Sequence, residues 1–327
     1  MSDKVLKVKN LAVVFKSRER KVHAVRGVDI EVNKGEIVGI VGESGSGKSV
    51  AMKAVIGILA DNASLSADVL SLGDKNLNNL SEREYQKIRG KDITMIFQDP
   101  MTALNPVIRV GKQLEEVIVR NSALSKKEAK EKALEMLERV GIPSPKESSK
   151  RYPHEFSGGM RQRVLIAMAL SCNPKLLIAD EPTTALDVTI QAQVLDLIKT
   201  MSKDAGTSVI LITHDLGVVA ETCDRVVIMY GGLVMETGSI EEIFYKPKHP
   251  YTMALLQAIP SIDMDEGERL KSIEGFPPSL IDPPKGCPFA ERCEFRMNIC
   301  DSKRPPLKAF SDTHTSMCFL NEEEPVH

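Results

Sequence analysis

A glycine-rich loop at residues 42–49 constrains the fold more than any other part of the sequence. It reads Gly-Glu-Ser-Gly-Ser-Gly-Lys-Ser and fits the pattern G-x-x-x-x-G-K-(S/T). The β-branched run at residues 36–41 precedes it, and residues 50–59 follow with apolar side chains at helical spacing. A strand, a tight loop and a helix in this order predict a phosphate-binding loop rather than a plain glycine turn.

Each residue type in this loop suits the binding of phosphate. The glycines let backbone N–H groups point inward at phosphate oxygens, and the helix N-terminus adds a favourable dipole. Lys48 is expected to neutralise the β- and γ-phosphates of a nucleotide, and Ser49 to bind Mg²⁺. The residues expected to contact the nucleotide here are Gly42, Ser44, Gly45, Ser46, Gly47, Lys48 and Ser49.

A second aliphatic strand, at residues 176–179, ends in the two carboxylates Asp180 and Glu181. Ligand sites of α/β folds lie at the carboxyl ends of parallel strands. Asp180 is expected to hold Mg²⁺, and Glu181 to orient and polarise a water for in-line attack on the γ-phosphate. A strand followed by a helix cap would explain this segment alone, but beside the loop it predicts nucleotide hydrolysis.

The segment Phe-Ser-Gly-Gly-Met-Arg-Gln-Arg-Val at residues 156–164 places a second Ser-Gly-Gly turn at the start of a helix. A helix N-terminus of this kind is another potential anion site. Since one nucleotide needs one phosphate cradle, the second cradle indicates a nucleotide shared with another subunit. A serine N-cap with glycine spacers is the simpler explanation for these three residues taken alone.

Strands and helices alternate through residue 245, which predicts an α/β core with a largely parallel sheet. Residues 225–237 read as a hairpin around two glycines, and residues 145–153 as a polar linker. After residue 246 the alternation stops, and eleven of the eighteen prolines lie between residues 247 and 325. We therefore predict a core domain at 1–245, with a helical subdomain inserted at about 99–160, and a loop-rich appendage at 246–327.

Composition excludes several classes of function. The net charge of −2, from 43 Lys and Arg against 45 Asp and Glu, gives no electrostatic case for nucleic-acid binding. Aromatic residues make up 4% and tryptophan is absent, which disfavours platforms for base stacking. No apolar run approaches the roughly 18–20 residues that span a bilayer, and the N-terminus has no signal-peptide pattern. The protein is expected to stay in the cytosol.

Four of the six cysteines lie in the last 41 residues, with the spacing C-x5-C-x6-C-x17-C. In a reducing compartment, such clustering favours a metal over disulfides. Four thiolates suit tetrahedral Zn²⁺ or an iron–sulfur cluster. The gaps are wider than the paired hooks of zinc ribbons, as a bulkier cluster requires. Free thiols or two disulfides are the alternative. The expected ligands are Cys287, Cys293, Cys300 and Cys318.

Together, the loop, the Ser-Gly-Gly helix start and the acidic strand end resemble an ATP-binding-cassette (ABC) ATPase over residues 4 to about 245. The resemblance implies an ABC-type P-loop NTPase fold with an N-terminal antiparallel β subdomain and a helical subdomain. It also implies that Ser157, Gly158 and Gly159 contact the γ-phosphate held by the opposite subunit. Residues 184–187, Thr-Ala-Leu-Asp, match the loop that bridges the two subunits in that family, and Asp187 is expected to contact the nucleotide.

Three further positions match functional residues of the same family. Gln98 corresponds to the glutamine that contacts Mg²⁺ and the attacking water, and His214 to the switch histidine. Phe15 corresponds to the aromatic residue that stacks on adenine, although an aromatic at a strand end is often part of the core. The loop at residues 99–106 corresponds to the place where the coupling helix of a membrane subunit docks.

Residues 246–252 and the downstream cysteines resemble the ATPases of oligopeptide, dipeptide and nickel importers, and most nearly the first ATPase of dipeptide or oligopeptide importers. The resemblance implies a peripheral protein at the cytoplasmic face of the membrane. Its implied partners are a second ABC ATPase, identical or different, two membrane permeases and, indirectly, an extracellular peptide-binding protein. The implied cofactors are ATP, Mg²⁺ and a structural 4Fe–4S cluster, with Zn²⁺ as the rival. A nickel importer ATPase and a non-transport ABC ATPase with a metal- or redox-sensing module are the alternative functions.

Overall fold

The computed structural model describes residues 4–17, 19–184, 186–258 and 273–322. The chain divides into two compact units. The first unit comprises Met1–Val5, Val32–Ile37 and Asn79–Ile212, and the second comprises Leu6–Glu31, Val38–Asn78 and Thr213–His327. The phosphate loop therefore lies in the second unit, and the acidic strand end lies in the first.

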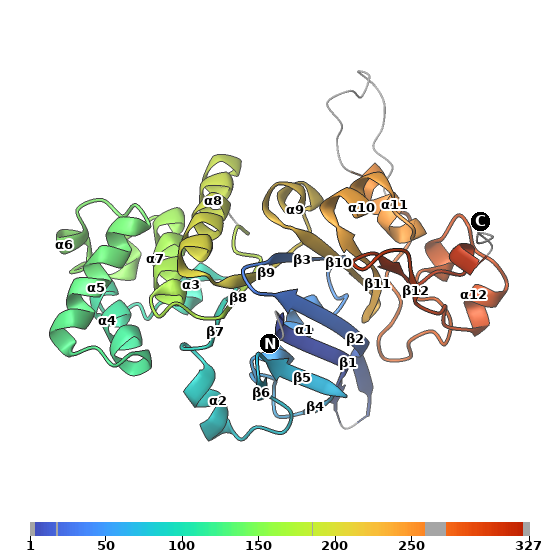
Figure 1. Ribbon diagram of the computed structural model, residues 1–327, viewed down its shortest axis with the longest axis horizontal. Coiled ribbons are helices and arrows are strands. Elements are labelled where there is room, and N and C mark those ends of the chain that lie inside the picture. The colour runs from blue at the N-terminus through green and yellow to red at the C-terminus, as the bar shows by residue number, and fades with distance from the viewer. Residues whose placement is uncertain (1–3, 18, 185, 259–272, 323–327) are drawn as a thin grey trace, which may run out of the picture. The chain divides into compact units, whose positions relative to one another are not determined.

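The first unit contains three strands that pair in parallel beside its helices (Figure 1). They are β7 (Ile93–Ile96), β8 (Leu176–Asp180) and β9 (Ser208–Thr213), with β8 in the middle. Every residue of β8 and β9 is buried, as expected for aliphatic runs covered on both faces. Ala179 pairs with Ile96 on one side and Leu211 on the other. The carboxyl ends of these strands therefore meet at one edge, where Gln98 and Glu181 follow.

The helices of the first unit lie both inside and outside the range of about 99–160, where a helical subdomain is predicted. They are α2 (Glu82–Ile88), α3 (Pro100–Ala103), α4 (Val110–Asn121), α5 (Lys126–Arg139), α6 (Pro145–Ser148), α7 (Gly158–Leu170) and α8 (Val188–Ala205). Helix α5 begins at a capping box, because the Ser125 hydroxyl accepts from the Glu128 amide and the Glu128 carboxylate accepts from the Ser125 amide. Helices α4 and α5 pack together, as do α7 and α8.

The prediction of a polar linker at residues 145–153 is wrong in part. This segment holds α6, followed by a 3-10 turn at Pro153–Glu155. Pro145 occupies the first turn of α6, where its missing N–H costs nothing, and the Ser148 hydroxyl donates to the Pro143 carbonyl at 2.6 Å. Pro145 and Ser148 thus stabilise a short helix in a segment whose polar composition indicates a loop.

The second unit begins with an antiparallel sheet in the order β2-β1-β5-β6, and β4 also pairs with β1. The strands are β1 (Lys4–Lys16), β2 (Lys21–Asn33), β4 (Ala63–Ser66), β5 (Val69–Leu72) and β6 (Lys75–Asn76). Alternate residues of β1, such as Leu6 and Val8, are fully buried, which matches the period-two pattern of the sequence. The three short strands β4, β5 and β6 were not predicted, since none is long enough to show that pattern.

A second group of strands in this unit surrounds the hairpin predicted at residues 225–237, which is confirmed. Strand β3 (Ile37–Val41) pairs in parallel with β10 (Arg225–Tyr230), and β10 pairs antiparallel with β11 (Leu233–Ser239). On its other side, β11 pairs with β13 (Thr315–Ser316), which in turn pairs with β12 (Lys308–Ala309). The helices are α1 (Lys48–Val55), α9 (Leu216–Thr222), α10 (Ile240–Tyr245), α11 (Pro250–Gln257) and α12 (Ile299–Ser302).

The segment after residue 245 is tied to this hairpin by buried contacts. The buried Glu236 carboxylate accepts from the amides of Lys248 and His249, at 2.6 and 3.0 Å, and lies 2.8 Å from Nε2 of His314. The His249 ring caps α11 by accepting from the Tyr251 amide, and its burial lowers its pKa to about 3. Residues 213–327 thus belong to one compact unit. The division at residues 245 and 246 stays a prediction.

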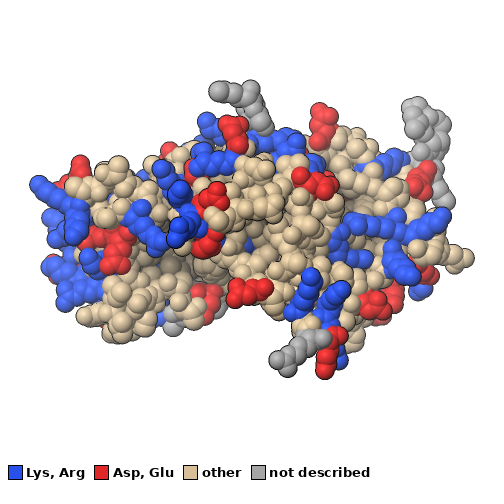
Figure 2. All heavy atoms as spheres, turned by 90° about the horizontal axis from the view of Figure 1, so that it is seen from below, with Lys and Arg blue, Asp and Glu red and all other residues tan. Residues whose placement is uncertain are grey.

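Charged side chains of both signs are scattered over the face of the molecule that Figure 2 shows. On the face shown in Figure 2, Lys and Arg side chains are interspersed with Asp and Glu side chains, in keeping with the net charge of −2. Within residues 4–17, 19–184, 186–258 and 273–322, no helix combines the length and the apolar character needed to traverse a lipid bilayer.

Candidate active site

The phosphate loop at residues 42–49 runs from β3 into α1. Gly42 has a φ of +155°, and a Cβ atom there would lie 2.0 Å from the carbonyl oxygen of Met229. Gly47 has a φ of +98°, and a Cβ atom there would lie 2.4 Å from the carbonyl oxygen of Ala24. Only glycine fits at either position, because the loop lies against the backbones of β10 and β2.

Lys48 is buried at the first position of α1, with 6% of its surface exposed. Its ammonium group donates to the carbonyl oxygens of Gly42 at 2.6 Å and Glu43 at 3.0 Å, and lies 3.5 Å from the Ser46 hydroxyl. The positive charge is therefore held inside the loop, where phosphate oxygens would replace the carbonyls as its partners. Ser49 follows, half-buried, in the first turn of the helix.

The acidic strand end of β8 brings Glu181 and Gln98 together. Asp180 is 3% exposed, and Glu181 follows it with a φ of +46°, a left-handed conformation that a non-glycine residue seldom adopts. The Glu181 amide donates to the Ile212 carbonyl at 2.9 Å. Its carboxylate accepts from the Gln98 side-chain amide at 2.8 Å. Such strained backbone clusters at functional sites, and this turn aims the carboxylate beyond the end of β8.

Thr184, predicted only as the first residue of the bridging loop at 184–187, is also a partner of this carboxylate. Its hydroxyl donates to the Glu181 carboxylate at 2.9 Å, and its amide donates to the Glu181 carbonyl at 3.2 Å. The available signal was local, because a hydroxyl residue three positions after an acidic one can close a tight turn.

Two predicted contact residues, Ser157 and Asp187, cap neighbouring helices of the first unit. The Ser157 hydroxyl accepts from the Met160 amide at 3.3 Å, and Asp187 accepts from the Ile190 amide at 3.0 Å. A Cβ atom on Gly159 would lie 2.9 Å from the Ile190 side chain, so glycine lets α7 and α8 pack closely. Ser157, Gly158 and Asp187 are all exposed.

Phe15 and His214 lie in the second unit with the phosphate loop. Phe15 is half-buried near the end of β1, where it pairs with Ala63 of β4. His214 is exposed directly after β9, and the Asp215 side chain then caps α9 by accepting from two of its amides. The other unit holds Gln98, Ser157, Gly158, Gly159, Asp180, Glu181 and Asp187.

The four clustered cysteines also lie in the second unit, and three of them are buried. The pKa of the Cys287 thiol is raised to about 12, mainly by burial, with a contribution from negative charge on the other three cysteines. Burial likewise raises the pKa of Cys318 to about 11. In the part of the chain that the structure describes, no group of three or more His, Cys, Asp or Glu side chains could hold a metal ion. The predicted iron–sulfur or zinc site is therefore not supported by this ligand geometry.

Comparisons with known proteins extend over almost the whole chain. The family model for ABC transporters matches residues 25–184, and the model for the oligopeptide/dipeptide transporter C-terminal region matches residues 235–300. The dipeptide transport ATP-binding protein DppD of Bacillus subtilis is 52% identical over 326 residues, which cover 99% of this chain and 97% of that protein. The oligopeptide transport ATP-binding protein OppD of Salmonella typhimurium is 50% identical over 320 residues, covering 98% and 95%.

A solved structure agrees with these matches. The dimeric ATP-binding cassette MJ0796, in a post-hydrolysis state with ADP and Pi, superposes with a TM-score of 0.64 at 29% identity. The match covers 72% of this chain and 98% of that one. The phosphate loop, the acidic strand end and this fold define an ABC ATPase, which confirms the predicted fold class. More closely, the chain belongs to the ABC transporter ATPases that carry the oligopeptide/dipeptide transporter C-terminal region.

Proposed function

We infer that this chain binds and hydrolyses ATP to energise the import of dipeptides or oligopeptides through partner membrane permeases. The observation that carries the inference is the identity of about half its residues, over nearly full length, with proteins named for dipeptide and oligopeptide transport. The C-terminal match extends the likeness beyond the part common to ABC transporters. This match therefore favours peptide import over nickel import. It also favours a transport function over a non-transport ABC ATPase.

The hydrolytic roles follow from chemistry at the two strand ends. We propose that Lys48 and the loop amides hold the phosphates of ATP, with Mg²⁺ bound by Ser49, Gln98 and Asp180. Glu181 would orient the attacking water, and its hydrogen bonds from Gln98 and Thr184 support this role by fixing its carboxylate. His214 would respond to the γ-phosphate, and Phe15 would stack on adenine.

A second ATPase subunit completes this proposal. Ser157, Gly158 and Asp187 are exposed at helix N-termini, as residues that reach a nucleotide on another subunit must be. The dimeric state of MJ0796 supports the same arrangement. We propose an ATP-sandwich dimer, made with an identical or a different ATPase, on the cytoplasmic face of the membrane with two permeases. An extracellular peptide-binding protein would deliver the ligand to them.

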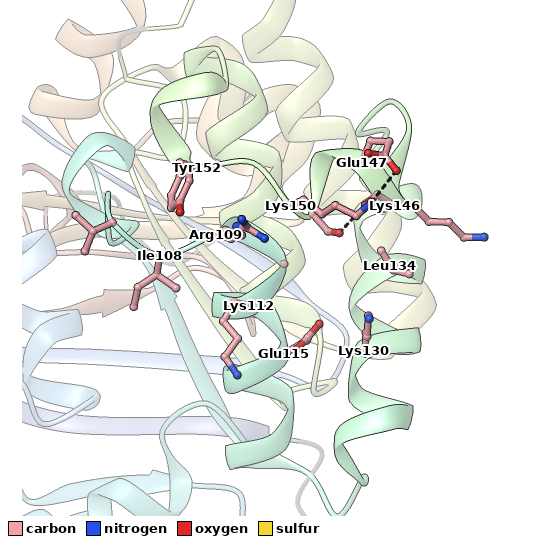
Figure 3. Close-up of a pocket in the computed structure, with 13 residues that line it drawn as sticks. Ile108, Arg109, Lys112, Glu115, Lys130, Leu134, Lys146, Glu147, Lys150 and Tyr152 are labelled. Carbon is pink, nitrogen blue, oxygen red and sulfur yellow. Dashed lines mark hydrogen bonds and ion pairs between the residues drawn. The ribbon is translucent and has the colours of Figure 1, made fainter.

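A basic groove in the helical part of the first unit supports permease docking. It has a volume of about 760 Å³ and lies between α4, α5 and the segment around α6 (Figure 3). The Arg109 guanidinium lies over the Tyr152 ring, 5.8 Å from its centroid, and Val107 is exposed at the rim. The cations that line the groove are Arg109, Lys112, Lys130, Lys146 and Lys150, against the two acids Glu115 and Glu147.

The loop at residues 99–106 follows Gln98 and leads into residues 107–109, which line the groove. The Gln113 side chain holds that loop, since it accepts from the Asn105 amide and donates to the Asn105 carbonyl, both at 2.9 Å. The excess of cations beside exposed apolar groups fits a cytoplasmic permease segment with acidic and apolar side chains. We therefore extend the predicted docking loop at residues 99–106 to include this groove.

Reconstitution tests the transport function. We expect the chain, assembled in lipid vesicles with its permeases and partner ATPase, to hydrolyse ATP several-fold faster when a peptide-loaded binding protein is added. The reason is that an importer couples turnover to delivery of its ligand. The measurement is phosphate release together with uptake of labelled peptide. Stimulation by nickel and not by peptide, or turnover indifferent to both, would contradict the assignment.

The same assembly of the chain with its permeases can test whether the basic groove binds a permease. The double variant Lys130→Glu/Lys150→Glu reverses two groove cations and should lose co-purification with the permeases. Lys127→Glu is the matched control, because Lys127 is exposed on the same helix α5 but does not line the groove. Equal recovery of permeases with both variants would remove the groove from the proposal.

For the C-terminal cysteines we propose a structural 4Fe–4S cluster, with Zn²⁺ as the rival. Negative charge on the other three cysteines contributes to the raised pKa of Cys287, and charge on Cys293 and Cys300 to that of Cys318. The amide N–H groups of Phe289 and Leu320 act in the opposite direction on these two thiols. These amide N–H groups favour the thiolate form of cysteine over the thiol. Four clustered cysteines in that form suit the ligand set of an iron–sulfur cluster. A cluster also spreads its ligands more widely than a single ion, which must hold every sulfur at about 2.3 Å.

Metal analysis after anaerobic purification tests this proposal. About four iron and four sulfide per chain are expected in the wild-type protein, because each cysteine supplies one ligand. The variant Cys300→Ser should lose them, and Cys172→Ser, which alters a cysteine of the other unit, should keep them. Stoichiometric zinc without iron would contradict the cluster. Metal-free protein with an ordered C-terminal region would contradict any metal site.

A further inference from the structure

We propose that Arg292 and Tyr251, both in the C-terminal region, are positioning residues for the phosphate loop and act through Glu43. The proposal rests on the proposed ATPase function and adds a role that lies outside the phosphate-loop motif. All three residues belong to the second unit, so the contacts are internal to one compact body.

Glu43 occupies the first unspecified position of the motif G-x-x-x-x-G-K-(S/T), and Arg292 binds its carboxylate. One terminal nitrogen of Arg292, Nη1, donates to Oε1 and Oε2 of Glu43, both at 2.9 Å. The arginine side chain is 7% exposed and the glutamate side chain 25% exposed, so water screens this ion pair little. The pair therefore differs from the exposed ion pairs of the surface, which contribute little.

The Arg292 guanidinium is itself held rigidly. Its Nη1 also lies 2.9 Å from the Tyr230 hydroxyl, its Nε donates to the Glu274 carbonyl at 2.8 Å, and its Nη2 donates to the Ile273 carbonyl at 2.9 Å. A planar guanidinium bound on several sides has a single orientation. Arg292 therefore transmits the position of the C-terminal backbone to Glu43.

The backbone of Glu43 is anchored as well. Its amide donates to the Tyr251 hydroxyl at 3.1 Å, and its carbonyl accepts from Lys48 at 3.0 Å. Tyr251 is fully buried, with its ring packed against Tyr230 and Phe289 at centroid distances of 4.6 and 5.1 Å. Side chain, amide and carbonyl of one loop residue are thus all engaged, and two of these contacts come from the C-terminal region.

Charge gives this arrangement its functional consequence. A phosphate loop binds a multiply charged anion, yet position 43 carries a carboxylate, which alone would repel the phosphates. Arg292 neutralises that carboxylate by holding both of its oxygens at 2.9 Å. Removal of one partner of a buried ion pair leaves the other charge uncompensated, which is the costly case. Loss of Arg292 should therefore weaken ATP binding through Glu43.

The test measures the affinity of the purified full chain for MgATP and its turnover with partner subunits. Arg292→Gln should raise Kd for MgATP about tenfold, because it leaves a negative charge beside the phosphates. The double variant Arg292→Gln/Glu43→Gln should return to within about threefold of wild type, since the offending charge is gone. At saturating ATP, kcat should change little in either. Arg296→Gln is the matched control, since Arg296 pairs with Asp301 at 2.8 Å in the same region.

An unchanged Kd in Arg292→Gln, or a double variant as weak as that single variant, would overturn the proposal. Should Arg292→Gln fail to fold, Tyr251→Phe decides, because it deletes only the hydroxyl that accepts from the Glu43 amide. Several-fold weaker binding supports the proposal, and wild-type affinity overturns it. A wild-type chain that neither binds nor hydrolyses MgATP would instead refute the proposed ATPase function, which keeps the two failures distinct.

Discussion

Glu181→Gln is expected to lower ATP turnover by about 100- to 10,000-fold while ATP stays bound, the range lost with a general base. The carboxylate accepts hydrogen bonds from Gln98 and Thr184, which fix its direction. An amide keeps the size of the side chain but cannot polarise a water in the same way. Trapped ATP should then hold two ATPase subunits together, and this dimer should accumulate in size-exclusion chromatography with MgATP.

Glu135→Gln provides the control for this experiment. Glu135 is an exposed residue of α5 that forms an i,i+3 ion pair with Lys132, so its amide variant should turn over like wild type. Unchanged hydrolysis in Glu181→Gln would remove Glu181 from the catalytic role. Loss of ATP binding together with hydrolysis would point to damage of the whole nucleotide site and would also contradict the assignment.

Ser157→Arg should abolish hydrolysis and leave ATP affinity within about threefold of wild type, because nucleotide binding depends on the phosphate loop. Ser157 is exposed at the start of α7, where a long cationic side chain would block the approach of another subunit. Lys48→Ala, by contrast, should lose ATP binding itself. In a pair of different ATPases the defect would fall on the nucleotide of the partner, so turnover is measured with both chains present.

Loss of the helix cap needs its own control, since an N-cap serine contributes about 1 kcal/mol. Ser125→Arg removes an equivalent cap, because the Ser125 hydroxyl accepts from the Glu128 amide at 3.3 Å, as Ser157 does from Met160. Only the Ser157 variant should lose hydrolysis. If Ser157→Arg lost ATP binding as completely as Lys48→Ala, a role in trans would be wrong.

The elements that the sequence predicted best are those with a strong local pattern. Buried aliphatic runs such as β8 and β9 show their own hydrophobicity, and the loop at 42–49 carries its motif together with its flanks. Strands of two to four residues such as β4 and β6 have too few positions for periodicity. Their pairing depends on a longer neighbour, β1 for β4 and β5 for β6, and that dependence is invisible locally.

The residues of the candidate site also differ in whether the local sequence could predict them. Motif spacing predicted Lys48 and Glu181, and the family resemblance predicted Gln98, because each stands next to a recognisable strand or loop. The contact between Arg292 and Glu43 joins positions 249 residues apart, and no local pattern marks it. The cysteine spacing indicated proximity, which the effect of the other three cysteines on the pKa of Cys287 supports. Spacing does not determine whether the sulfurs converge on one ion.

The pairing of β11 with β13 bears on self-association. Without β12 and β13, one side of β11 would present unpaired amide and carbonyl groups at Glu236 and Thr237, which are now paired with Ser316 and Thr315. Exposed strand edges recruit strands from other chains. The C-terminal residues therefore end this group of strands with two-residue strands that offer little template for another molecule, and in doing so they protect the hairpin from aggregation.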